Sequence, residues 1–381
     1  TARGGGRCGS ARGQRGGRGG NSAAGAMAVW EHVKVGGAAP GGPGPRSSHG
    51  TSAGQAGGAR CTACSSCGGH VWVIGGEERA REPAGMAVWR LDLGDLDVAH
   101  AAPAWRLCGP KAGEGASPPA RNAHAQGLLG TDLWVFGGRT SAQEGSVLDD
   151  LWRFDTVAEA WHGPVPVASG APPPARSYHA ACAAGGRFYV FGGCGAEGRL
   201  ADFHCFDPET RAWRELPAPP SVEGRGGPVL EAFAGGHTLL LFAGFAGRET
   251  RDVLTFDVRR EEWTRRADLG PGLASRSVCA CFPTPDGRII VYGGEVVPSE
   301  RGHDGAGGFS GEILEFDAEG NARVLAQNVA EAPRPTPRGW TTMAPLPPVP
   351  GATIRGFLYG GLAGDDDAPE RLADAWVLSI A

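Results

Sequence analysis

The stretch "FYVFGG" at residues 188–193 is one of six short apolar runs that end in a pair of small residues. The others are VWVIGG (71–76), LWVFGG (133–138), LLLFAG (239–244), IIVYGG (289–294) and GFLYGG (356–361). Apolar runs of this length are typical of buried strands, and glycine allows a strand to end sharply where another backbone comes close. The final glycines recur every 50 to 67 residues, which indicates a fold built from internal repeats.

Each repeat also contains the pattern of two further strands. Three segments join an aspartate to a tryptophan, in the order strand, tight turn and outer strand: LWRFDTVAEAW (151–161), FHCFDPETRAW (203–213) and VLTFDVRREEW (253–263). Arg323 stands at the tryptophan position of the fifth unit. The spacing of the units and their order of strands are close to those of kelch repeats.

The two ends of the chain complement each other. The sixth unit ends at "LADAWVLSIA" (372–381) without an outer strand, whereas "AVWEHVKV" (28–35) is a spare one. The sequence therefore predicts an all-β, six-bladed kelch-type β-propeller over residues 27–381, closed by an N-terminal strand that completes the last blade.

Composition narrows the kinds of partner and the cellular compartment that suit the chain. The net charge of −5 is mixed along the chain, and no apolar run approaches the length of a spanning helix, so we expect neither a nucleic-acid nor a membrane partner. The ten cysteines show no pairing pattern, which favours thiols in a reducing compartment and a cytoplasmic protein. Residues 1–26 hold five arginines and no acid, and are expected to be disordered. An RNA-binding tail and a targeting segment are both open interpretations of that segment.

An arginine lies near the start of the first strand of every repeat: Arg46, Arg121, Arg176, Arg225, Arg276 and Arg338. Because the innermost strands of a propeller line its axis, the pseudo-symmetry is expected to gather these guanidiniums at one mouth of the channel. Such a ring can bind a sulfate, phosphate or carboxylate group. The alternative is that each arginine pairs with an acid and serves packing. Both interpretations remain open from the sequence, and a mixture with two or three of the arginines free is the expected outcome.

The residue after each small pair lies on that same face: Glu77, Arg139, Cys194, Phe245, Glu295 and Leu362. The loop that Glu295 opens, "EVVPSERGHDGAG", therefore projects over the mouth. A carboxylate and an imidazole brought together there, from Glu295 and His303, suit a divalent first-row metal such as Fe(II). Glu300, Asp304 or Ser299 are candidates for a third ligand. A solvated loop without a site is the alternative.

Other sites are less well supported. "CTACSSC" (61–67) has CxxC spacing but no second pair of cysteines or histidines follows, so zinc is not expected. A copper-radical oxidase needs metal-bound tyrosines. Three of the four tyrosines lie in apolar runs predicted to be buried strands: Tyr189, Tyr292 and Tyr359. That class of enzyme is excluded. No phosphate-binding loop or nucleophile elbow is present.

Several segments, in order along the chain, resemble the plant specifier proteins: nitrile-specifier, epithiospecifier and thiocyanate-forming proteins. The resemblance rests on "WEHVKV…GPGPRSSHG", "VFGGR" ending at Arg139, "ASRSV", "IIVYGGEV" with its E-x7-H loop, "PRGW", and "YGGLAGDDDAPERLADAWVLSI". It implies a kelch propeller that binds Fe(II) through a Glu, an Asp and a His of this loop. It also implies an activity that directs the aglucone released from glucosinolates by myrosinase toward nitriles, epithionitriles or thiocyanates.

The resemblance assigns roles to particular residues. Glu295 and His303 match the metal ligands, Arg139 an arginine of the substrate mouth, and Trp340 a pocket tryptophan. Ser299 stands where the family has its aspartate, so either Glu300 completes the metal site with a shifted loop, which is the expectation adopted, or iron binding is lost. The function implied is an iron-dependent, lyase-like breakdown of an anionic, sulfur-containing substrate. A non-catalytic kelch scaffold that binds protein partners is the alternative.

Overall fold

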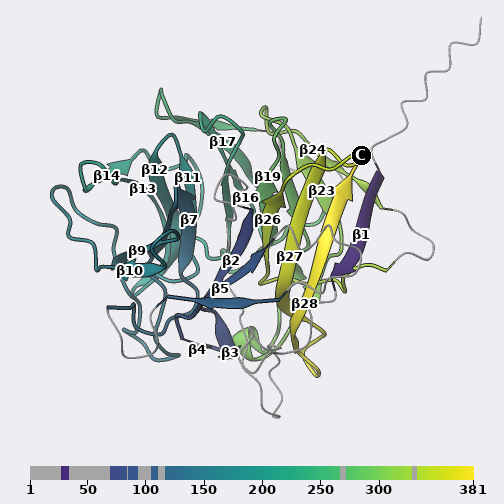
Figure 1. The fold of residues 1–381 in the computed structure, drawn as a ribbon, viewed down its shortest axis with the longest axis horizontal. Coiled ribbons are helices and arrows are strands. Elements are labelled where there is room, and N and C mark those ends of the chain that lie inside the picture. The colour runs from purple at the N-terminus through teal and green to yellow at the C-terminus, as the bar shows by residue number, and fades with distance from the viewer. Residues whose placement is uncertain are drawn as a thin grey trace, which may run out of the picture.

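The computed structural model describes residues 27–33, 69–83, 85–92, 104–109, 116–266, 272–327 and 333–381 (Figure 1). The predicted N-terminal segment 1–26, Arg46 and the cysteine motif at 61–67 lie outside these residues. No helix in the described ranges is long and apolar enough to cross a membrane.

The described strands form the six blades of a β-propeller. Within each blade neighbouring strands are antiparallel, except for one short parallel pair at the outer edge of the sixth. The first blade contains β2 (His70–Ile74), β5 (Val88–Asp92) and β6 (Arg106–Cys108). The second contains β7 (Ala125–Leu129), β8 (Asp132–Phe136), β9 (Leu151–Asp155) and β10 (Ala160–His162). The third contains β11 (Ala180–Ala184), β12 (Arg187–Gly195), β13 (Gly198–Asp207) and β14 (Ala212–Leu216).

The remaining three blades follow the same order. The fourth contains β15 (Val229–Ala232), β16 (Thr238–Phe242), β17 (Val253–Asp257) and β18 (Glu262–Arg265). The fifth contains β19 (Ala280–Pro283), β20 (Ile289–Tyr292), β23 (Ile313–Phe316) and β24 (Ala322–Val324). The sixth contains β26 (Thr342–Leu346), β27 (Ile354–Ala363), β28 (Glu370–Ile380) and β1 (Met27–Val33), with β25 (Ala326–Gln327) beside β1.

The N-terminal strand closes the ring, as the sequence predicts. In Figure 1 the purple β1 runs beside the yellow β28, and the two pair antiparallel with Trp30 opposite Leu378. The Trp30 side chain is 4% exposed, and its ring lies 4.9 Å from that of Tyr292 in the fifth blade. The first segment of the patterned chain is therefore built into the last blade and packs against its neighbour.

One strand position differs from the prediction. In the second blade Trp161 pairs with Phe154 across the turn, but in the fifth blade Phe316 pairs with Ala322 rather than with Arg323. The turn of the fifth blade is one residue shorter, because Asp317 closes directly onto Asn321 through a backbone hydrogen bond. The tryptophan position is thus held by Ala322, and Arg323 pairs with Glu315 instead.

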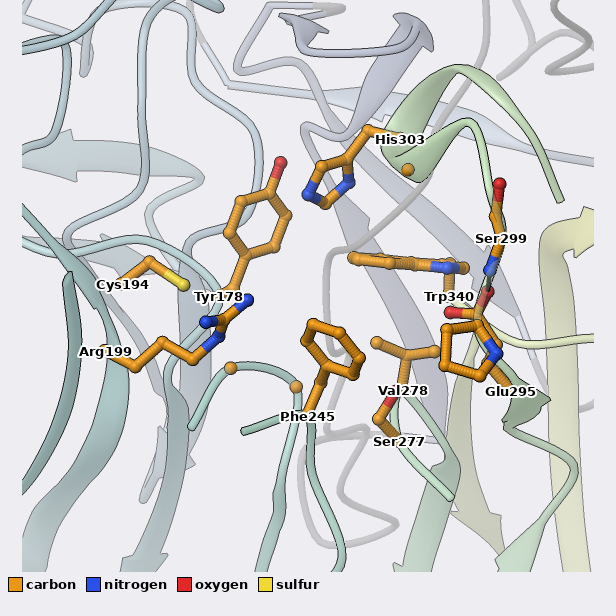
Figure 2. A pocket seen from close by; sticks show the side chains of 14 residues that line it. Tyr178, Cys194, Arg199, Phe245, Ser277, Val278, Glu295, Ser299, His303 and Trp340 are labelled. Carbon is orange, nitrogen blue, oxygen red and sulfur yellow. Dashed lines mark hydrogen bonds between the residues drawn. The ribbon is translucent and has the colours of Figure 1, made fainter. Parts of the chain in front are cut away.

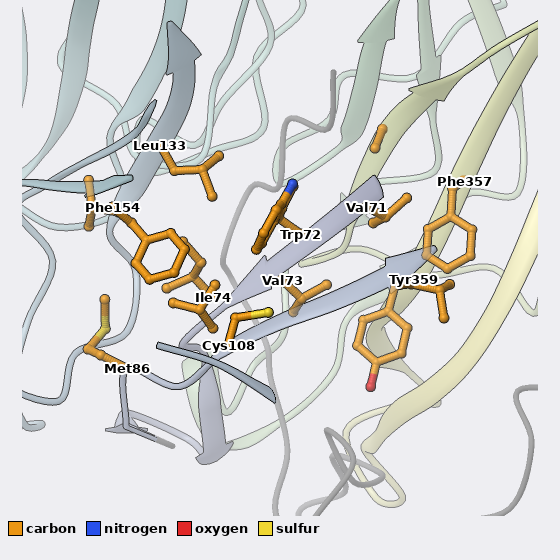
Figure 3. Close-up of a cluster of buried hydrophobic side chains, with 14 of the residues drawn as sticks. Val71, Trp72, Val73, Ile74, Met86, Cys108, Leu133, Phe154, Phe357 and Tyr359 are labelled. Atoms are coloured by element: carbon orange, nitrogen blue, oxygen red, sulfur yellow. The ribbon is translucent and has the colours of Figure 1, made fainter. Parts of the chain in front are cut away.

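Both faces of a blade are covered by its neighbours, which explains why the middle strands are continuous apolar runs rather than alternating ones. Figure 3 shows the cluster where the first blade meets the second and the sixth. There Trp72 is 1% exposed and lies 6.0 Å from the ring of Phe154, and Phe357 and Tyr359 belong to the same cluster. This packing holds the blades at fixed positions around the axis.

A chain of backbone hydrogen bonds links the inner edges of five blades. The amide of Tyr178 donates to Ala123, Gly227 to Tyr178, Val278 to Gly227, and Trp340 to Val278, at 2.7 to 3.0 Å. All five residues have φ between 50° and 59°, the left-handed region that ordinarily favours glycine. This hydrogen-bonded chain forms the floor beneath the candidate site.

Small hairpins and one turn of helix lie at the end of the blades where that floor is found. They are β3 (Glu77–Arg79) with β4 (Glu82–Pro83), β21 (Glu295–Val297) with β22 (Gly308–Phe309), and the 3-10 helix η2 (Gly302–Asp304). They carry the loop that the sequence singled out.

Candidate functional site

A pocket of about 130 Å³ opens at the mouth of the channel and is lined by residues of the third, fourth, fifth and sixth blades (Figure 2). Its wall includes side chains from four blades: Tyr178, Cys194, Arg199, Phe245, Ser277, Val278, Glu295, Ser299, His303 and Trp340. The pocket therefore joins predicted residues to others that no local sequence pattern connects.

Glu295 is fixed at the start of β21. Its backbone exchanges two hydrogen bonds of 3.0 Å with Ser277, and its Oε1 accepts the amide of Ser299 at 3.1 Å. Burial raises the pKa of Glu295, while the amides of Ser299 and Gly307 act in the opposite direction. The carboxyl group is thus held rigidly at the pocket wall with only 8% of the residue exposed.

His303 lies in η2 on the opposite side of the same loop. Its ring stacks on Tyr178 with centroids 4.8 Å apart and meets the edge of Trp340 at 5.2 Å. Burial lowers its pKa to about 3, and the positive charges of nearby arginines act in the same direction. The imidazole is therefore neutral near pH 7, the state in which a histidine binds a metal. The structure brings Glu295 and His303 to one pocket.

Two of the three candidates for a third ligand, including the expected Glu300, are not at this pocket. Glu300 and Asp304 are both exposed and do not line it. The Ser299 hydroxyl hydrogen-bonds Asp366 Oδ1, and the Glu300 amide donates to Asp366 Oδ2 at 2.9 Å. Asp366 thus ties the loop to the sixth blade, a contact across 67 residues of sequence that no local pattern reveals. Across the described ranges, no three His, Cys, Asp or Glu side chains are gathered into a ready-made metal cluster.

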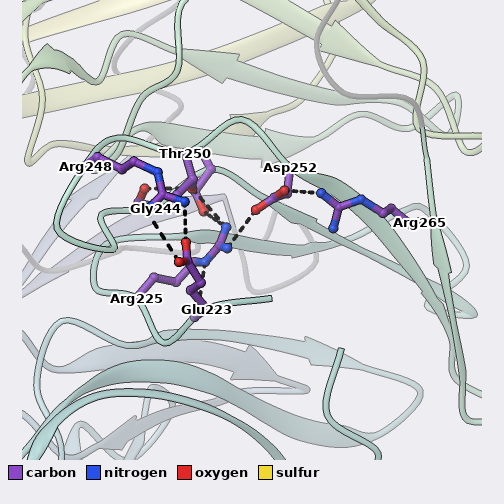
Figure 4. Close-up of polar contacts among 8 residues, drawn as sticks. Glu223, Arg225, Gly244, Arg248, Thr250, Asp252 and Arg265 are labelled. Atoms are coloured by element: carbon purple, nitrogen blue, oxygen red, sulfur yellow. Dashed lines mark hydrogen bonds and ion pairs between the residues drawn. The ribbon is translucent and has the colours of Figure 1, made fainter. Parts of the chain in front are cut away.

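The ring arginines are buried rather than presented at the mouth. Five of them are 0 or 1% exposed: Arg121, Arg176, Arg225, Arg276 and Arg338. Each pairs with an acid at the third strand of its own blade, respectively Asp150, Asp202, Asp252, Glu312 and Asp374. Figure 4 shows one such site, where Arg225 contacts Asp252 and Thr250.

The packing interpretation therefore holds for these five, and none of them lines the pocket. A guanidinium without water needs a carboxylate and carbonyl acceptors close by, which the blade itself supplies. The binding interpretation, which the sequence left open, is corrected for these five, because each of them is paired with an acid. Arg46, the sixth member, lies outside the described residues.

A different set of arginines contributes positive charge that lowers the pKa of His303. They are Arg81, Arg139, Arg371 and Arg199. The Arg139 guanidinium donates to the carbonyls of Ser141, Ala142 and Gln143, at 2.7 to 3.2 Å, so it is held by its own loop. Arg199 is exposed, with its guanidinium carbon 4.8 Å from the centre of the Phe245 ring. No carboxylate of the described residues pairs with Arg199, which leaves a cation available at the pocket wall.

Two rings of side chains line this mouth, and the sequence revealed only the first. The second ring is found in the second to sixth blades. Its members stand one residue before the strand position that pairs with the last glycine of the repeat: Val147, Arg199, Glu249, Phe309 and Arg371. The spacing between glycine and returning strand varies from blade to blade, which hides this ring from the linear pattern. Trp340, expected in the pocket, does line it.

Fold and repeats together define a six-bladed kelch β-propeller with a pocket at one mouth. A sequence model described as "KLHDC2/KLHL20/DRC7 Kelch-repeats domain" matches residues 60–294, so the chain belongs to the kelch-repeat family. The chain is 28% identical over 234 residues to "N-(sulfonatooxy)prop-2-enimidothioate sulfolyase" of Thlaspi arvense, covering 56% of this chain and 65% of that protein. This match supports the resemblance predicted from the sequence, with the chain as a diverged specifier-like member of the kelch family.

Other relatives carry different names. "Adagio-like protein 3" of Oryza sativa subsp. japonica is 32% identical over 256 residues, covering 62% of this chain and 38% of that protein. "Kelch domain-containing protein 3" of Homo sapiens is 29% identical over 203 residues, covering 49% and 51%. The matched part spans less than two thirds of each of these relatives.

Proposed function

We propose that the pocket binds a small anionic, sulfur-containing molecule of the glucosinolate-aglucone type and directs its breakdown toward a nitrile with the help of Fe(II). The observation that carries this proposal is the meeting of Glu295 and neutral His303 in one pocket below a group of arginines. The name of the Thlaspi arvense relative specifies a sulfonatooxy group on an imidothioate, which has the charge and the sulfur that such a pocket would meet.

The donor set suits the metal in part. A buried carboxylate and a neutral imidazole, from Glu295 and His303, are ligands that Fe(II) accepts. Iron bound there would act as a Lewis acid toward the substrate sulfur. The loop keeps both donors in place, because the Ser299 amide holds the Glu295 carboxylate and the Tyr178 ring holds the imidazole.

The rest of the pocket recognises the substrate. Arg199 offers a guanidinium to the sulfate, and no carboxylate of the described residues competes for it. Phe245, Val278 and Trp340 supply apolar walls that accommodate the side chain of the substrate and exclude water. Charge at one end and apolar surface at the other would orient the molecule with its sulfur toward the carboxylate and the imidazole.

The test is a myrosinase-coupled assay with an allyl glucosinolate, in which nitrile and isothiocyanate products are measured by gas chromatography. With Fe(II), the parent protein is expected to raise the nitrile fraction, and Glu295→Gln or His303→Ala to abolish the rise. Arg199→Ala is expected to raise the substrate concentration needed for half the effect about tenfold, the loss of one charged contact of about 1.4 kcal/mol.

The matched control is Arg214→Ala, which removes an exposed arginine paired with Glu261 on the outer strands. It should leave the product ratio unchanged. A product mixture identical to that of myrosinase alone, with every variant, would overturn the proposal and favour the scaffold alternative.

A further inference from the structure

The floor of the pocket carries no side chain where the fourth blade crosses it. Four of the five floor residues have side chains, although all five share the left-handed backbone: Ala123, Tyr178, Gly227, Val278 and Trp340. Glycine is favoured at such φ values because it has no Cβ. Here alanine, tyrosine, valine and tryptophan adopt the same conformation, so φ alone does not explain Gly227. A Cβ built on Gly227 would come within 2.6 Å of Val278 Cγ1, so the valine leans into the room that this glycine leaves.

The preceding residue, Gly226, is a glycine for neither of the usual reasons. Its φ lies outside the left-handed region, and its backbone exchanges two hydrogen bonds with Phe245, at 2.8 and 3.0 Å. Residues at the same position of the other described blades are Asn122, Ser177, Ser277 and Gly339. An added Cβ on Gly339 would lie 2.8 Å from the ring of Phe309, whereas on Gly226 the nearest atom is Cys194 Sγ at 3.2 Å, the end of a side chain that can rotate. The side chain missing at Gly226 therefore leaves room in the pocket, which this residue lines.

The walls around Gly226 and Gly227, which we call the bare patch, are largely apolar. Figure 2 shows Cys194 on one side of the pocket and Val278 on the other. Burial raises the pKa of the Cys194 thiol, so the thiol is uncharged near pH 7 and acts as a small apolar group. Val278 is 8% exposed. The bare patch is thus suited to hydrocarbon rather than to a charged group.

A cation stands at the edge of the bare patch. The guanidinium carbon of Arg199 lies 4.8 Å from the centre of the Phe245 ring, and the backbone of Phe245 is bound to Gly226. In the part of the chain that the structure describes, no carboxylate pairs with Arg199. The pocket has a volume of about 130 Å³, whereas a cavity of about 150 Å³ accepts benzene. The room beside the cation therefore suits a chain of fewer than six carbon atoms.

We infer that Gly226 and Gly227 form an apolar subsite that selects a substrate whose side chain is unbranched and has fewer than six carbons. This rests on the proposed function, in which Arg199 binds the anionic group. A side chain at Gly226 would occupy the subsite directly, and one at Gly227 would do so by displacing Val278. Such a subsite discriminates by size, because each methylene that it buries raises the affinity about fourfold and an atom that does not fit is excluded.

The test measures how strongly the full chain binds linear alkyl sulfonates, from methanesulfonate to octanesulfonate, by isothermal titration calorimetry. A sulfonate is stable and carries the charge that Arg199 would bind. In the parent, the affinity should rise about fourfold for each added carbon and stop rising before six carbons. Gly226→Val should bind methanesulfonate as the parent does and lose the rise with chain length. Gly226→Ala should weaken butanesulfonate binding about fourfold, the loss of one buried methylene.

Two further variants make the result specific to the bare patch. Gly311→Ala is the matched control, because Gly311 also has an ordinary φ, its added Cβ would lie 3.4 Å from Pro337, and it does not line the pocket. It should bind the whole series as the parent does. Arg199→Ala should weaken every member of the series by the same factor. Unchanged methanesulfonate binding shows that each glycine variant is folded.

The outcomes separate this inference from the proposed function. If the parent binds methanesulfonate without a rise along the series, if the rise continues to octanesulfonate, or if Gly226→Val keeps the rise, the subsite is overturned and the anion site of the proposed function stands. If the rise depends on Gly226 but the myrosinase-coupled assay gives no additional nitrile, the subsite stands and the proposed function fails. Absence of any sulfonate binding by the parent overturns the subsite together with the anion site.

Discussion

Arg371 in β28 donates a hydrogen bond to Glu77 in β3, with 2.6 Å between Nη2 and Oε1, and so joins the sixth blade to the first. The same carboxylate also accepts the Asn122 side chain of the second blade at 2.6 Å and the backbone amide of Arg81 at 3.0 Å. One side chain thus connects three blades at the mouth. The Arg371 side chain is 4% exposed and that of Glu77 16%, so water competes little for the pair.

Removing the charge of Glu77 should therefore loosen the ring. We expect Glu77→Gln to lower the free energy of unfolding by about 3 kcal/mol, because Arg371 is left buried without a carboxylate. Urea unfolding followed by tryptophan fluorescence measures this difference. The double variant Glu77→Gln with Arg371→Gln should recover part of the loss, and a loss that stays below about 0.5 kcal/mol in the single variant would show that the contact is dispensable.

The buried arginines inside the blades have a structural role that can be separated from binding. Arg176→Met leaves Asp202 without its bidentate partner, so we expect a loss of stability of about 3–5 kcal/mol. Arg187→Met removes an arginine of the same blade whose side chain is 43% exposed and pairs with Asp207, and it should lose at most about 1 kcal/mol. Urea unfolding of both variants at one pH gives the comparison. Equal losses would contradict the distinction between buried and exposed pairs.

Much of the fold was predictable because its signals are local. Each "GG" run predicts a strand end by itself, and counting the runs gives the number of blades. The closing strand was predictable because the sixth repeat shows the pattern of only three strands and the segment around Trp30 has the pattern of an outer fourth strand. The error at Arg323 has the same origin, since the spacing was assumed constant and the turn after Asp317 is one residue shorter.

The site was predictable only as far as one loop extends. Glu295 and His303 lie eight residues apart, so sequence reasoning placed them together. Asp366 and Arg199 come from other blades, where loop lengths differ and no common spacing marks them. The ring arginines were placed at the correct end of each strand, but the sequence does not reveal that an acid of the same blade covers each of the five that the structure describes.

The closing strand gives a direct test of ring closure. Trp30→Ala removes a nearly buried ring that packs on Tyr292, so we expect a loss of about 3–5 kcal/mol in the free energy of unfolding. Val29→Ala changes a residue of the same strand that is 36% exposed, and its effect should stay within about 1 kcal/mol. Urea unfolding measures both. If the two variants are equally stable, the strand does not contribute its packing to the last blade.

His124 in the second blade should make the protein sensitive to acid. Its residue is 2% exposed, and burial, followed by the charge of Arg121, lowers its pKa to about 3. The unfolded chain takes up a proton near pH 6.5 while the folded protein does not, so the stabilising effect is complete above that pH and is lost as the pH falls toward 3. Between pH 7 and pH 4 the parent should therefore lose about 3 kcal/mol more stability than His124→Gln, since about 1.4 kcal/mol is lost for each pH unit below 6.5. Urea unfolding at several pH values measures this slope.

The control is His162→Gln, at an exposed histidine of the same blade, which should keep the slope of the parent. Parallel curves for the parent and His124→Gln would rule out a neutral buried imidazole at His124.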